Sequence, residues 1–96
     1  MKKMSTPSRT VNFRWPHHGR QVQLAGSFTS WSPVDMVKQD QLWTVQMKVS
    51  PGKHEYKFVV DETEWVHDDQ QPCLKNEVGS YNNVIDVEMS PSIEVS

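Results

Sequence analysis

The residues best suited to chemistry are a lysine and two tryptophans that the hydrophobic pattern leaves outside the core. In HEYKFVV, residues 54–60, apolar side chains alternate with Lys57, which places Lys57 on the outer face of a predicted strand. Trp65 follows the polar turn DETE, and Trp31 lies in the polar loop SFTSWSP. An exposed indole offers a flat face with negative quadrupole, and a lysine offers three hydrogen-bond donors.

These side chains come together if residues 54–60 and 64–67 form a hairpin around DETE. Lys57 then lies near Trp65, and the result is an aromatic platform flanked by a donor. A pyranose presents C–H groups on its ring faces and hydroxyls at its rim, so it suits such a surface. The pairing therefore predicts a sugar site.

The segment NEVGSYNN, residues 76–83, supplies further groups of the kind that a sugar site needs. Ser80, Asn82 and Asn83 carry hydroxyl and amide functions, and Gly79 allows a tight backbone turn. Residues 68–83 show no clear alternation and predict a sixteen-residue loop, which is long for so small a domain. Loops of that length tend to be functional.

Short alternating runs recur along the chain and predict an all-β antiparallel sandwich of about seven strands. The runs 11–15 and 22–26 are expected to pair as a hairpin across PHHGR, and a weaker run at 34–38 is expected to add a strand. The inward phase of these runs predicts the core: Val11, Phe13, Trp15, Val22, Leu24, Trp43, Val45, Met47, Val49, Tyr56, Phe58, Val60, Ile85, Val87 and Met89. Trp15 and Trp43 are thus expected to be buried, and Trp31 and Trp65 exposed.

Length and composition predict one small domain whose net charge would not attract a strongly charged partner. The chain has 96 residues, a net charge of −2 and one cysteine, so neither nucleic acid nor an anionic membrane is expected as a partner. No apolar stretch has the length of a signal or a membrane span, and cytoplasmic localisation is expected. Residues 1–10 and 90–96 are expected to be flexible tails around a module at 11–89.

Several segments in order along the chain resemble the glycogen-binding module of the beta subunits of AMP-activated protein kinase, a member of carbohydrate-binding module family 48. The resemblance rests on FRW at 13–15, GSFTSW at 26–31, PGKHEYKFVVD at 51–61, WVHD at 65–68 and VGSYNNVIDV at 78–87. It implies an immunoglobulin-like (early-set) sandwich that binds α-1,4-linked glucan, as in glycogen, starch, maltodextrin or cyclodextrin, without catalysis.

The resemblance also implies roles for six residues. Trp31 and Trp65 correspond to the stacking platforms, and Lys57 corresponds to the lysine that hydrogen-bonds sugar hydroxyls. In the last loop, Val78 is expected to touch the sugar by its apolar side chain, while Ser80 and Asn82 are expected to hydrogen-bond it. Val78 replaces a longer leucine, and DETE replaces a shorter turn, so the contacts at these two places differ from those of the kinase modules.

Other functions are weighed against glucan binding. A protein-interaction scaffold could keep the sandwich and lose the sugar, and an accessory domain of a glucan branching or debranching enzyme would need several hundred further residues. A kinase or a glucan-metabolising enzyme is the expected protein partner. PHHG at 16–19 and HDD at 67–69 contain potential metal ligands, but their spacing completes no metal site, and no nucleophile with its base is recognisable. No metal, cofactor or enzymatic activity is expected.

Overall fold

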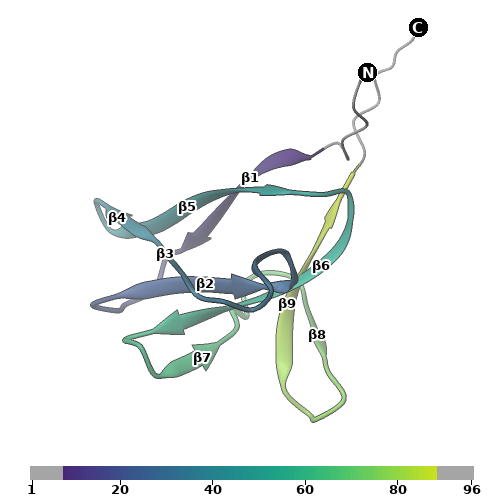
Figure 1. Cartoon of the computed structure of the whole chain (residues 1–96). Helices are drawn as coiled ribbons and strands as arrows, with labels where there is room; N and C mark the ends of the chain where they lie inside the picture. Colours follow the sequence, from purple (N-terminus) through teal and green to yellow (C-terminus); the bar gives the residue numbers. More distant parts are fainter. Residues whose placement is uncertain (1–7, 89–96) are drawn as a thin grey trace, which may run out of the picture.

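The computed structural model describes residues 8–88, which form strands and one short 3-10 helix (Figure 1). The elements in chain order are β1 (Arg9–Trp15), β2 (Val22–Gly26), η1 (Ser27–Thr29), β3 (Val34–Asp35), β4 (Val37–Gln39), β5 (Leu42–Val49), β6 (Gly52–Val60), β7 (Glu64–Val66), β8 (Cys73–Lys75) and β9 (Tyr81–Val87). The predicted tails lie outside the described residues except at Ser8, Arg9 and Thr10, and the last two of these belong to β1. Met89, expected in the core, also lies outside.

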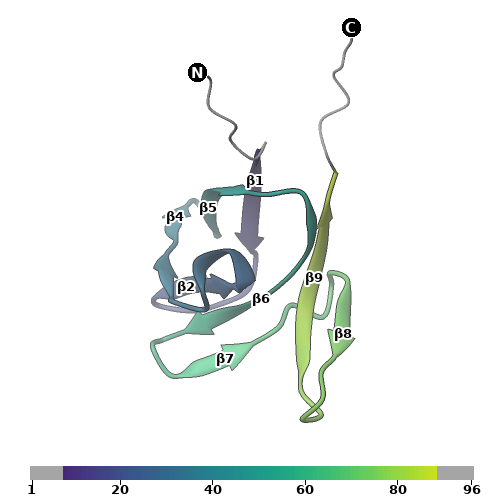
Figure 2. The same ribbon diagram turned by 45° about the vertical axis from the view of Figure 1, so that its right-hand side comes forward.

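The strands form two antiparallel sheets. Sheet A has the order β1-β5-β4, and sheet B has the order β3-β2-β6-β9-β8, with β7 paired to β6 beside β9. In Figure 1, β1 and β5 lie above β2 and β6, and Figure 2 shows β8 and β9 as a hairpin that reaches beyond β7. The predicted all-β sandwich is confirmed. The strand number exceeds the expected seven because short strands of two or three residues add to the long ones.

The core lies between the inner faces of the two sheets, as the alternation predicted. Phe13, Val22 and Leu24 are buried, and Phe13 stacks on Phe28 and meets the edge of Tyr56. Trp15 is buried as expected, but the prediction for Trp43 was only partly right because this ring is half-buried against the core. Trp43 lies at the start of β5, near the edge of the sandwich, where it pairs with Lys38 of the three-residue strand β4.

The expected hairpin of the first two strands was wrong. Strand β1 pairs with β5 through seven residue pairs, whereas β2 pairs with β6 and β3 in the other sheet. The alternation in 11–15 and 22–26 reports an inner face for each strand and does not distinguish a shared sheet from two facing sheets. The weaker run at 34–38 also divides between the sheets, because the chain crosses at buried Met36, whose N–H donates to the carbonyl of Val22.

The expected sixteen-residue loop at 68–83 is largely a hairpin. It contains β8 and the first three residues of β9, which pair from Cys73↔Asn83 to Lys75↔Tyr81. The side chain of Asn83 is fully buried and makes three hydrogen bonds: it accepts from Asp68 N and donates to the carbonyls of Asp68 and Pro72. This amide replaces a strand partner for residues 68–72 and holds them against β9.

Candidate carbohydrate-binding face

The outer face of sheet B carries several of the side chains that the sequence singled out. The predicted hairpin around DETE is confirmed: β6 and β7 pair at Val59↔Trp65, so Trp65 lies beside the strand that carries Lys57. Three residues join the strands, and the Thr63 N–H donates to the carbonyl of Val60. The two central residues of this turn, Asp61 and Glu62, have φ of 52° and 70°, the left-handed conformation of a type I′ turn. The Asp61 carboxylate accepts from the N–H groups of Arg20 and Gln21, which lowers its pKa and ties this turn to the one before β2.

A strained loop presents Trp31. After η1, Ser30 and Trp31 have φ of 55° and 60°, and the Trp31 N–H donates to the carbonyl of Gly26 over 2.8 Å. Thr29 also bonds the backbone of Gly26, so the whole loop is anchored at the end of β2. Left-handed backbone costs a residue with a side chain about 1–2 kcal/mol, and such strain clusters at functional sites. Trp31 is 39% exposed and Trp65 is 44% exposed, as predicted.

The lysine and the last loop are joined by a hydrogen bond. Lys57 Nζ donates to Ser80 Oγ over 2.7 Å, and both residues are half-buried. The turn that carries Ser80 is closed by Asn76, whose carboxamide oxygen accepts from the N–H groups of Val78 and Ser80. Gly79 has φ of 88°, as its predicted turn role requires, and Val78 is 86% exposed at the tip. The loop is therefore preformed, with an apolar tip and a polar base.

The two asparagines of the last segment differ sharply from one another. Asn83 was expected among the sugar-binding amides, but it points inward and is fully used in holding residues 68–72. Asn82 points to the outer face, yet it is only 8% exposed and its Nδ2 donates to Glu55 Oε1 over 2.7 Å. Glu55 was not among the expected site residues. The structure thus adds a carboxylate to the face, next to Lys57 on the same strand.

Comparison with known proteins gives this face its context. Residues 9–94 match the family described as the glycogen recognition site of AMP-activated protein kinase. The chain belongs to this family. The beta-1 subunit of 5'-AMP-activated protein kinase from Sus scrofa is 35% identical over 85 residues, which cover 88% of this chain and 69% of the pig sequence. The beta-1 subunit from Rattus norvegicus is 34% identical over 86 residues, or 90% of this chain and 32% of the rat sequence.

A second isoform gives a similar result. The beta-2 subunit from Mus musculus is 34% identical over 89 residues, which cover 92% of this chain and 32% of the mouse sequence. The chain therefore spans about a third of the length of the rat and mouse relatives. The glycogen recognition family is a carbohydrate-binding module, and the family resemblance read from the short motifs is confirmed.

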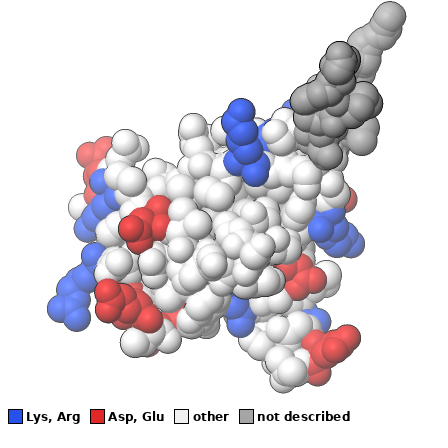
Figure 3. Space-filling view, viewed as in Figure 1, with Lys and Arg blue, Asp and Glu red and all other residues white. Residues whose placement is uncertain are grey.

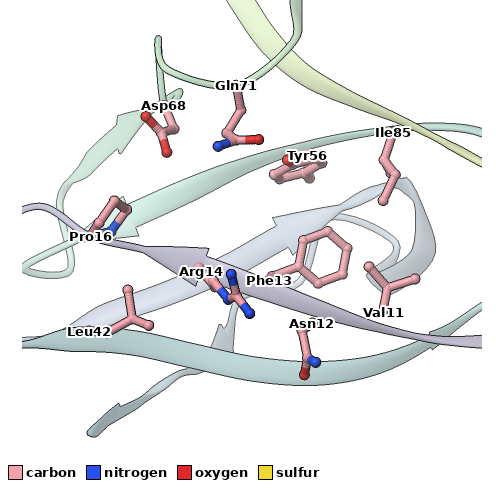
Figure 4. Close-up of a pocket in the computed structure, with 10 residues that line it drawn as sticks. All are labelled: Val11, Asn12, Phe13, Arg14, Pro16, Leu42, Tyr56, Asp68, Gln71 and Ile85. Atoms are coloured by element: carbon pink, nitrogen blue, oxygen red, sulfur yellow. The ribbon is translucent and has the colours of Figure 1, made fainter. Parts of the chain in front are cut away.

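A cavity of about 600 Å³ lies on the other side of this glycogen recognition module, between β1 and the strands β6 and β9 (Figure 4). It is lined by Val11, Asn12, Phe13, Arg14, Pro16, Leu42, Tyr56, Asp68, Gln71 and Ile85. None of the six expected sugar-binding residues is among them. The cavity marks the open side of the sandwich, where sheet A ends at β1.

Two titratable groups at this cavity are buried. Asp68 is 1% exposed, and its Oδ1 lies 3.0 Å from His17 Nε2 while its Oδ2 has no hydrogen-bond partner among residues 8–88. Burial and then the Asp68 charge raise the pKa of Tyr56 to about 12. The sequence offered PHHG and HDD as metal ligands, and the structure brings one residue of each together. No group of three such residues that could hold a metal forms within 8–88.

Charged side chains on the surface drawn in Figure 3 are scattered, with both signs interspersed. A neutral ligand such as a glucan is held by stacking and hydrogen bonds and needs no field of one sign. Glu55 was detectable in the sequence only as an outward residue two positions from Lys57. Nothing in the sequence indicated that it binds Asn82, because that contact joins residues 27 positions apart.

Proposed function

We propose that the outer face of sheet B binds α-1,4-linked glucan chains without hydrolysing them, and so attaches an associated protein to glycogen or a similar polymer. The observation that carries this proposal is the position of exposed Trp65 beside β6, on the face where Lys57 pairs with Ser80. A second exposed tryptophan, Trp31, lies in the loop that follows β2 of the same sheet. Membership of the glycogen recognition family supports the same ligand.

Each expected residue has a specific part in this proposal. Trp31 and Trp65 stack on pyranose rings, and Val78 adds apolar contact from the loop tip. Lys57 retains two N–H groups after its bond to Ser80, and the Ser80 hydroxyl can still donate, so both meet sugar hydroxyls. Asn82 reaches the ligand only through its small exposed part, and its Nδ2 donates to Glu55.

The test is a titration of the 96-residue chain with maltoheptaose, followed by tryptophan fluorescence or amide chemical shifts. A shallow, wet groove predicts dissociation constants from about micromolar to about millimolar, or roughly −8 to −4 kcal/mol. Trp31→Ala, Trp65→Ala and Lys57→Ala should each weaken binding about tenfold or more. Thr63→Ala, an exposed change in the β6–β7 turn, is the control. No response of the unaltered chain at millimolar sugar would refute the proposal, and reducing-end assays should stay blank.

The proposal also concerns the protein that this module would attach to the glucan. The relatives are named as kinase beta subunits, so a kinase assembly is the partner that we propose to be brought to the polymer. The measurement is recovery of kinase subunits with the chain on insoluble starch or glycogen, with soluble maltoheptaose as competitor. The cytoplasmic localisation stays a prediction.

A further inference from the structure

We propose that Glu55 is a specificity-determining residue of this face: its carboxylate accepts hydrogen bonds from sugar hydroxyls and disfavours glucans that carry phosphate. This inference rests on the proposed function. Glu55 lies on β6 two residues before Lys57, so the two side chains project from the same face at a spacing of about 7 Å along the strand.

The hydrogen bonds of the face leave Glu55 with unused acceptor capacity. Its Oε1 receives one N–H of Asn82, and within residues 8–88 no side-chain or backbone donor bonds Oε2. An ionised carboxylate accepts about four hydrogen bonds, so a half-buried Glu55 can hold Asn82 and still accept from a ligand. Asn82, in contrast, is 8% exposed. A ligand at this point therefore meets more hydrogen-bond acceptor capacity on Glu55 than on Asn82.

Lys57 and Glu55 together match the chemistry of a neutral diol. Each sugar hydroxyl donates one hydrogen bond and accepts others, so adjacent hydroxyls are satisfied by an ammonium donor on one side and a carboxylate acceptor on the other. Both contacts are charge-assisted and are about twice as strong as neutral ones. The two protein pairs, Lys57–Ser80 and Glu55–Asn82, hold these groups in place before a ligand arrives.

A surface hollow connects Glu55 with the tip of the last loop. Its lining comprises Glu55, Lys75, Asn76, Glu77 and Val78. Val78 is the residue expected to make apolar contact with the sugar, and Glu55 lines the same hollow. A glucan chain that contacts Val78 within this hollow is therefore also within reach of Glu55. A phosphate monoester in this hollow would be repelled by the carboxylates of Glu55 and Glu77 and attracted by the ammonium of Lys75, so the charge of Glu55 lowers its affinity relative to an uncharged side chain at position 55.

The experiment compares Glu55→Gln and Glu55→Ala with the unaltered chain, with maltoheptaose and a singly phosphorylated maltoheptaose as probes. Glu55→Gln keeps an acceptor for Asn82 but loses the charge, and about threefold weaker maltoheptaose binding is expected; Glu55→Ala should lose about tenfold. The preference for the neutral sugar over the phosphorylated one should shrink about threefold in Glu55→Gln. Glu62→Gln, a charge-matched change in the β6–β7 turn, should bind like the unaltered chain, and thermal melts confirm folding.

The outcomes separate the possible roles of Glu55. If Glu55→Ala weakens binding but Glu55→Gln leaves both affinities unchanged, Glu55 only positions Asn82 and the proposal is wrong. If Trp31→Ala abolishes binding while both Glu55 variants bind within twofold of the unaltered chain, Glu55 does not meet the sugar. Failure of the unaltered chain to bind either sugar would refute the proposed function itself, and this inference with it. Should Glu55→Ala not fold, the two affinities of Glu55→Gln decide.

Discussion

The two faces of sheet B use the same strands for different purposes. On the inner face of β6, Phe58 and Val60 are almost fully buried against sheet A. On its outer face, Glu55 and Lys57 are half-buried; Glu55 is hydrogen-bonded to Asn82 of β9 and Lys57 to Ser80 just before β9. The inner face is mainly apolar and depends on packing, whereas the outer face of β6 combines buried Val59 with polar pairs that a ligand can reach.

This difference teaches how a small domain can carry a site without weakening its core. A change on the inner face removes buried apolar area and leaves a cavity, so it should affect folding first. A change on the outer face removes contacts that are made mainly with a ligand, so it should affect binding first. Each prediction below tests whether the two faces separate in this way, from the largest expected effect to the smallest.

Phe58→Ala should destabilise the fold most. Phe58 is 1% exposed and packs against Trp15 and Tyr56, so truncation should lower the free energy of unfolding by about 3–5 kcal/mol. Denaturant unfolding measures the change. Trp65→Ala on the outer face is the matched aromatic control and should lower the free energy of unfolding by less than about 1 kcal/mol. Similar losses for both would show that the faces are not separate.

The neighbouring asparagines on β9 test the same division with polar side chains. Asn83→Ala removes three buried hydrogen bonds and should lower the free energy of unfolding by about 2–4 kcal/mol. Asn82→Ala removes a single bond to Glu55 at the outer face, and about 1 kcal/mol is expected. Thermal and denaturant unfolding of both variants give the comparison. A greater loss for Asn82→Ala would reverse the assignment of the two faces.

Gly26→Ala should affect both the stability of the fold and the binding of sugar. A Cβ at this position would lie 2.8 Å from the carbonyl oxygen of Glu55 and from the ring of Phe28, so η1 must shift. Overpacking of this kind costs about 1–3 kcal/mol of stability, and maltoheptaose affinity should also fall because the loop that holds Trp31 begins at Gly26. Ser32→Ala, an exposed change in the same loop, is the control. Unchanged sugar affinity would show that Trp31 does not depend on this anchor.

Tyr56 provides the smallest effect, a dependence of stability on alkaline pH. Its folded pKa is raised to about 12 from an ordinary value of 10.0, so the fold favours the neutral phenol. The associated stability is fully present below pH 10 and is lost as pH rises from about 10 toward 12. Tyr56→Phe should flatten this part of the pH profile in unfolding experiments. A profile for Tyr56→Phe identical to that of the unaltered chain would contradict the assignment.

Strand phase was the part of the fold that the sequence determined. The alternation in residues 54–60 predicted the buried Tyr56 and Phe58 and the outward Lys57, because side chains of a strand point to opposite faces in turn. The polar surroundings of Trp31 and Trp65 predicted their exposure, and the turn residues between 60 and 64 predicted the hairpin. Each of these predictions depends only on residues that are neighbours in the chain, so the sequence was sufficient for it.

Only the tertiary structure decided which strands pair and which polar groups meet. The alternation could not show that β1 pairs with β5 rather than β2, because it reports the face of a strand and not its neighbour. Asn82 and Asn83 are identical in type and adjacent in sequence, yet one bonds Glu55 and the other bonds residues 68 and 72. A hydrogen bond depends on distances between atoms that the chain brings together over long separations, and no local pattern records those distances.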